Sequence, residues 1–125
     1  MIKIVVVVFV GGGLGAVLRE LCMLIVPPLA DGFPLDILAA NLGASFLLGF
    51  ATALHRRKAV SDGVNSLVGT GIAGGLSTFS SFVYGVAVLV TDSAASALVA
   101  SAYVVVSILM GYVAVLAGAR LGRTY

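Results

Sequence analysis

The sequence has little charge, and this scarcity limits the class of protein. Only 10% of its 125 residues are charged, whereas 61% are hydrophobic; an average soluble domain carries about 25% charged residues. So apolar a composition argues against a disordered chain, and the lack of clustered charge argues against a nucleic-acid-binding protein. With the single cysteine Cys22 the chain cannot form an intrachain disulfide, which excludes a small secreted module held together by disulfides.

What the chain has instead is long uncharged runs between small groups of charged residues. They predict four membrane-spanning helices at about residues 3–26, 34–54, 64–90 and 94–119, because about 20 apolar residues cross the hydrocarbon core of a bilayer. We therefore expect an all-α membrane protein with a single four-helix transmembrane domain over residues 1–125. The later spans also argue against interpreting the N-terminal apolar run as a cleaved signal peptide.

Four spans place both chain ends and the 55–63 connection on one side of the membrane. That side would hold most of the basic residues, namely Lys3, Arg56, Arg57, Lys58, Arg120 and Arg123. The other side would hold at most one basic residue, Arg19, together with Asp31, Asp36 and Asp92. This bias favours a cytoplasmic location of both termini by the positive-inside rule.

The glycine-rich start of the chain has two interpretations. Residues 11–16 match G-x-G-x-x-A, and Asp31 follows about 20 residues later, as in a dinucleotide-binding fingerprint. A doubly wound fold, however, needs amphipathic crossover helices, and the later segments here are apolar all round. We favour the alternative that Gly11, Gly15 and Arg19 form one stripe at i, i+4, i+8, where small residues allow helices to approach closely.

Polar residues within the spans are the main functional candidates, because an unpaired polar group in the membrane is costly. In the second span, Asn41 and Ser45 share a face, and in the fourth span Tyr103 and Ser107 do so. Each set could face an anion or a pore. Each could equally serve helix packing through an interhelical hydrogen bond or a serine bonded to its own helix.

The third span contains a motif that is unsuited to a continuous helix. Gly74 and Gly75 precede Ser77 and Thr78, and such residues are poor in a helix interior. We predict a break between Gly74 and Thr78, which at membrane depth would be buried, line a cavity or bind an ion. Phe79 and Phe82 follow at i, i+3; their positive ring edges could face an anion, or the rings could simply face lipid or the core.

These residues together resemble the Fluc (CrcB) family of bacterial fluoride channels. The matching stretches are residues 12–19, Asn41-Leu42-Gly43 with Gly49, and residues 74–82. The resemblance implies an antiparallel, dual-topology homodimer with two pores. It implies passive, fluoride-selective export from the cytoplasm through the bacterial plasma (inner) membrane, with no enzymatic activity, no organic cofactor and no nucleic-acid partner.

The resemblance also implies roles for individual residues. Asn41 would line the pore as a hydrogen-bond donor, and the ring edges of Phe79 and Phe82 would coordinate fluoride. Tyr103 and Ser107 would belong to a polar track, and Ser80 and Ser81 of the third-span motif are further pore candidates. Arg19 would serve the vestibule or the fold. Backbone carbonyls of Gly74 and Ser77 would hold a central structural sodium ion on the two-fold axis.

Two other functions fit the size of the chain. One is a small dual-topology multidrug exporter coupled to protons, which would need a carboxylate buried in the membrane; Glu20 lies too near an interface to serve well. The other is a non-transporting scaffold subunit, which would need only small-residue seams and would give no reason for the Ser-Thr-Phe-Ser-Ser-Phe run of residues 77–82.

Overall fold

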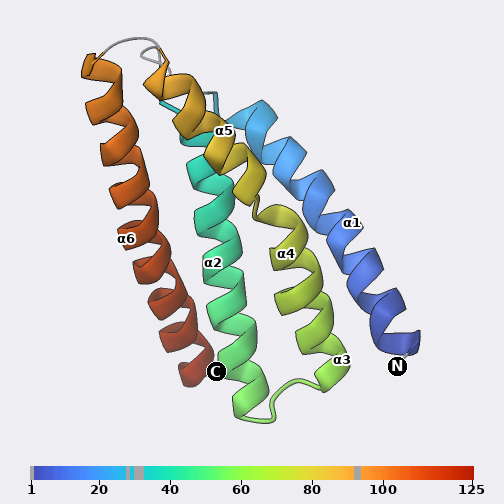
Figure 1. The fold of residues 1–125 in the computed structure, drawn as a ribbon. Helices are drawn as coiled ribbons and strands as arrows, with labels where there is room; N and C mark the ends of the chain where they lie inside the picture. The colour runs from blue at the N-terminus through green and yellow to red at the C-terminus, as the bar shows by residue number, and fades with distance from the viewer. Residues whose placement is uncertain (1, 28, 30–32, 92–93) are drawn as a thin grey trace.

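The protein is all-helical, and its helices lie alongside one another as an antiparallel bundle (Figure 1). The computed structural model describes residues 2–27, 29, 33–91 and 94–125. Helix α1 covers Ile2–Ile25, α2 covers Leu35–Arg56 and α6 covers Ala94–Thr124. Between α2 and α6 the chain forms α3 (Asp62–Asn65), η1 (Ser66–Ile72), α4 (Ala73–Leu76) and α5 (Phe79–Val90).

Among the described residues, four helical segments are long and apolar enough to cross a membrane. They are Ile2–Ile25, Leu35–Arg56, Asp62–Val90 and Ala97–Thr124, close to the expected spans. The last helix continues to Thr124 rather than ending near residue 119. Asp31 and Asp92, expected on the less basic side, lie outside the described residues. Large apolar side chains such as Phe9 and Leu24 point outward, as expected of helices whose surroundings are lipid.

The third span is interrupted, as predicted. Helix α4 ends at Leu76, and Ser77 and Thr78 are extended, with φ/ψ of −72°/150° and −146°/110°. Helix α5 then begins at Phe79. A second irregularity, the π-helical turns of η1 before α4, was not predicted from the sequence. Such wide turns are uncommon and often occur at functional sites.

Glycines allow two pairs of helices to pack with their backbones in contact. Gly11 and Gly15 of α1 face η1 and α4; a Cβ at Gly11 would lie 2.6 Å from the Leu67 carbonyl oxygen. Gly49 of α2 and Gly118 of α6 meet each other's helix backbone in the same way. The stripe of N-terminal glycines thus forms a close helix–helix contact, in which α1 packs against η1 and α4. The second glycine contact packs α2 along α6.

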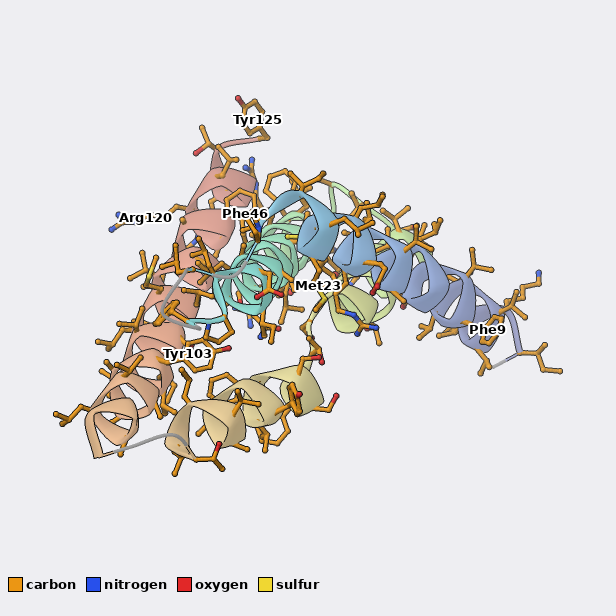
Figure 2. All side chains as sticks on the ribbon, turned by 90° about the horizontal axis from the view of Figure 1, so that it is seen from above. Phe9, Met23, Phe46, Tyr103, Arg120 and Tyr125 are labelled. Carbon is orange, nitrogen blue, oxygen red and sulfur yellow. The ribbon has the colours of Figure 1, made fainter. Side chains whose placement is uncertain are left out.

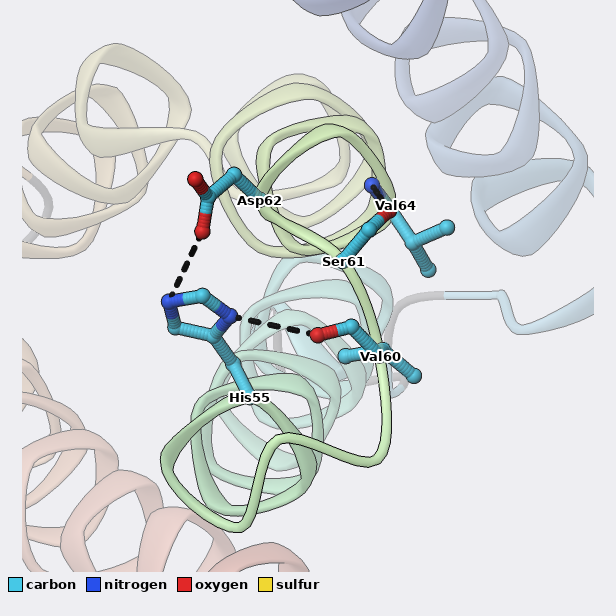
Figure 3. Close-up of polar contacts among 5 residues, drawn as sticks. All are labelled: His55, Val60, Ser61, Asp62 and Val64. Atoms are coloured by element: carbon cyan, nitrogen blue, oxygen red, sulfur yellow. Dashed lines mark hydrogen bonds and ion pairs between the residues drawn. The ribbon is translucent and has the colours of Figure 1, made fainter.

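Both termini and the α2–α3 connection lie at one end of the bundle, as the span count predicts (Figure 1). The connection is held locally (Figure 3). His55 Nε2 lies 3.5 Å from Asp62 Oδ1, and Ser61 Oγ accepts a hydrogen bond from the Val64 amide at the start of α3. The end of the bundle that holds most of the basic residues therefore also holds an acidic residue, Asp62, which is a partner for His55.

Candidate functional site

The break in the third span opens onto a hollow between α2 and α5. This hollow has a volume of about 230 Å³. It is lined by residues that the sequence singled out, namely Asn41, Ser45, Ser77, Thr78, Phe79 and Phe82. The other pore candidates, Ser80, Ser81, Tyr103 and Ser107, do not line it. Residues that are far apart in the sequence thus meet at one place, which we call the break hollow. None of these lining residues carries a formal charge.

Asn41 bridges the interrupted backbone. Its Oδ1 accepts a hydrogen bond from the Thr78 amide at 2.8 Å, and its Nδ2 donates to the Thr78 carbonyl oxygen at 3.4 Å. The side-chain amide thus replaces the helical partner of the Thr78 N–H and gives a second donor to the Thr78 carbonyl, which also accepts from the Phe82 amide. Since an asparagine Nδ2 carries two hydrogens, one N–H donor is left after this bridge. The interhelical bond and the anion-facing donor, which the sequence left as alternatives, are therefore compatible.

Thr78 organises the start of α5. Its Oγ1 accepts a hydrogen bond from the Ser81 amide at 3.1 Å, the N-cap arrangement that starts a helix, and donates to Ser81 Oγ at 2.9 Å. Ser80 Oγ lies 3.3 Å from the same atom. Ser80 is exposed and Ser81 is half-buried. The sequence analysis placed Thr78 in the break but gave it no role; its position before Phe79 in an S-T-x-S-S pattern is the signal of a helix cap.

The break leaves several backbone carbonyls without their usual helical partners, those of Gly74 and Ser77 among them. In a continuous helix the Thr78 amide would bond to the Gly74 carbonyl, and the Ser81 amide to the Ser77 carbonyl. Here the first amide donates to Asn41 and the second to Thr78 Oγ1. Gly74 and Ser77 also line a second hollow of about 160 Å³. Carbonyl oxygens are suitable ligands for a dehydrated alkali cation, so these two residues fit the sodium expected from the resemblance.

Arg19 lies at the same break, on the side of α1. Its Nη1 donates a hydrogen bond to the Gly75 carbonyl oxygen at 3.3 Å. A cation at the C-terminal end of a helix also interacts favourably with the helix dipole. The structure therefore gives Arg19 a contact with the fold of the broken span.

An aromatic row extends from the break hollow to α6. The Phe79 and Phe82 rings have centroids 6.1 Å apart, and Phe82 lies 5.2 Å from Tyr103. Tyr103 is fully buried between α6, α2 and α5 (Figure 2), whereas Phe79 is 79% exposed. The hydroxyls of Tyr103 and Ser107 are close to each other but have no hydrogen bond of ordinary geometry within the described residues. Two buried hydroxyls with unused hydrogen-bonding capacity therefore lie beside the break hollow.

The fold and the site define a class of protein: a small, four-span membrane protein with a bridged break in its third span. The sequence matches the family described as CrcB-like protein, Camphor Resistance (CrcB), over residues 6–119. The chain belongs to this family.

Relatives within the family have named functions. The chain is 57% identical over 123 residues to fluoride-specific ion channel FluC 2 of Brucella melitensis, an alignment covering 98% of this chain and 46% of that protein. It is 48% identical over 122 residues to fluoride-specific ion channel FluC 3 of Yersinia pseudotuberculosis, covering 98% and 90% of the two chains. The chain spans about half the length of the Brucella relatives it matches. These relatives are named as channels rather than enzymes, in agreement with the expectation from the sequence.

Proposed function

We propose that this protein is a passive, fluoride-selective channel. The observation that carries the proposal is the break hollow, in which an amide, hydroxyls and two phenyl rings converge without a charged side chain. The names of its relatives within the family support the choice of fluoride. These names also favour a channel over the proton-coupled multidrug exporter that the sequence alone left as an alternative.

The chemistry of the hollow suits a small anion that has lost its water. The remaining N–H of Asn41 would donate a hydrogen bond to it, and the ring edges of Phe79 and Phe82 would present their positive rims. Ser80 and Ser81 do not line the hollow but adjoin it through Thr78 Oγ1, and the hydroxyl of either would be a further donor. Tyr103 and Ser107 would continue the row of donors toward α6. Weak donors without a fixed cation favour conduction, because the ion must bind well enough to enter and weakly enough to leave.

We propose further that two copies pair in antiparallel orientation, with dual topology and two pores. Support comes from the open side of the hollow: Phe79 is 79% exposed in a single chain, so one chain encloses no complete passage. The carbonyls of Gly74 and Ser77 would hold a sodium ion jointly with those of the second copy. When bound, the ion would supply a positive charge that ties the two breaks together.

Flux from reconstituted vesicles tests the proposal. Purified protein in liposomes loaded with fluoride is expected to release it passively, with no dependence on a proton gradient, and to retain chloride under the same conditions. Phe79→Ile is expected to abolish this release while leaving the protein folded and dimeric by size-exclusion chromatography. Ser101→Ala serves as the matched control, because Ser101 Oγ donates only to its own helix, at Ala97 O, on an exposed face. Equal release of fluoride and chloride would contradict the proposal.

A further inference from the structure

A larger pocket lies at the basic end of the bundle, between the last turns of α2 and α6. Its volume is about 640 Å³. Three arginines, Arg56, Arg57 and Arg123, line it together with apolar and small residues that include Leu48 and Thr52. None of the described lining residues is acidic. We call it the arginine pocket.

The arginine pocket and the break hollow lie along one face of α2, with a second hollow between them. Asn41, Ser45, Leu48, Thr52 and Arg56 follow each other at steps of three or four residues, the spacing of one helix face. Ser45 and Ser77 line both the break hollow and the second hollow beside Gly74, and Leu48 lines both that second hollow and the arginine pocket. The three spaces therefore adjoin in sequence along α2, from the phenyl rings to the arginines.

We propose that the arginine pocket is the mouth that collects anions for the conduction path, an inference that rests on the proposed channel function. Guanidinium groups are always charged, and several in one concave site raise the local concentration of anions. Arg57 is partly engaged, because its Nη1 donates to the Arg123 carbonyl oxygen and so holds the end of α6 against α2. Arg56 and Arg123 are the residues whose charge serves the anion.

The position of these residues also permits a purely structural role, since cations stabilise the C-terminal ends of helices. The two roles differ in a measurable way. Electrostatic attraction of an ion in water weakens as salt is added, because the Debye length falls from about 30 Å at 10 mM to about 3 Å at 1 M. A loss of helix stability would lower flux at both salt concentrations.

The test compares initial fluoride flux through Arg56→Gln, Arg123→Gln and the double variant at subsaturating fluoride. The vesicles contain only zwitterionic lipid, and potassium isethionate sets the ionic strength. At about 10 mM salt each single change is expected to lower flux about twofold and the double change about fourfold, with the differences disappearing near 1 M. Arg123→Lys should retain the flux. Arg120→Gln is the matched control. It removes the same charge from the same helix as Arg123→Gln, but Arg120 does not line the arginine pocket.

Several results would overturn the inference. One is flux through the double variant equal to that of Arg120→Gln at low salt; another is a deficit that salt does not remove. An effect seen only in vesicles with anionic lipid would mean that the pocket binds a lipid headgroup instead. If the unaltered protein passes no fluoride, the proposed function fails and this inference fails with it. If the unaltered protein passes fluoride and the arginine substitutions do not change the flux, only the role of the arginine pocket is refuted and the proposed channel function stands.

Discussion

The bridge from Asn41 to Thr78 makes a quantitative prediction for Asn41→Ala. The substitution removes hydrogen bonds of 2.8 and 3.4 Å. The Thr78 carbonyl retains the Phe82 amide as a donor at 3.3 Å, so only the Thr78 N–H loses its one partner. An unsatisfied buried donor costs about 1–3 kcal/mol and an interhelical bond in a membrane is worth about 0.6–2 kcal/mol. We expect a loss of about 2 kcal/mol in the free energy of unfolding, roughly a 30-fold change in the folding equilibrium.

The assay is denaturant unfolding in mixed micelles, with fluoride flux measured on the same preparations. Asn41→Asp separates the two roles of the residue, since a protonated carboxyl group can still accept from the Thr78 amide and donate to the Thr78 carbonyl but has no second hydrogen for an anion. This variant should remain nearly as stable as the unaltered protein and yet pass little fluoride. Ser101→Ala should match the unaltered protein in both measurements. An unfolding free energy unchanged in Asn41→Ala would refute the bridge as a support of the break, and full flux through Asn41→Asp would refute the donor role.

Three further substitutions test the packing and the aromatic row. Gly15→Ala should lower the thermal midpoint in detergent, because its Cβ would meet the backbone of η1 and α4, and overpacking of this kind costs about 1–3 kcal/mol; Gly13→Ala, whose Cβ meets nothing within 4 Å, should be neutral or slightly stabilising. Phe79→Ile should leave the midpoint of the single chain nearly unchanged, because the ring is 79% exposed, so that its loss of flux reports on the anion path. Tyr103→Phe should preserve the fold, because the hydroxyl has no hydrogen-bond partner of ordinary geometry among the described residues. It should lower fluoride flux if that hydroxyl serves the ion; unchanged flux would assign Tyr103 to packing alone.

The break could be predicted from the sequence because its cause is local. A Gly-Gly pair followed by Ser77 and Thr78 disfavours a helix interior on propensity alone. A close contact of the first span with another helix could also be predicted, since Gly11 and Gly15 recur at helix spacing; that its partner is the third span could not. In both cases, residues adjacent on one element determine the outcome.

The partners across the break could not be predicted, because they depend on how two helices lie relative to each other. Nothing in the spacing of Asn41 indicates that it faces Thr78 rather than another residue of the third span. The contact of Arg19 with Gly75 could not be predicted for the same reason, because it depends on where α1 packs against α4. The wide turns of η1 escaped prediction for a different reason: Ser66–Ile72 has no residue that forbids an ordinary α-helix, so tertiary packing rather than local preference sets its geometry.

The small number of charged residues in this chain is related to the way in which the break in its third span is stabilised. A broken helix in a membrane needs partners for its freed amides and carbonyls, and charged side chains would provide them at the cost of holding an anion too tightly. Here the Asn41 amide bonds to the Thr78 N–H, the Thr78 hydroxyl accepts from the Ser81 N–H, and Arg19 donates to the Gly75 carbonyl. The break hollow consequently stays uncharged, and the nearest dense positive charge lies at the basic end of α2. In the channel proposed here, attraction of the anion and its passage would thus occur at different places, so that the first could be strong without making the second slow.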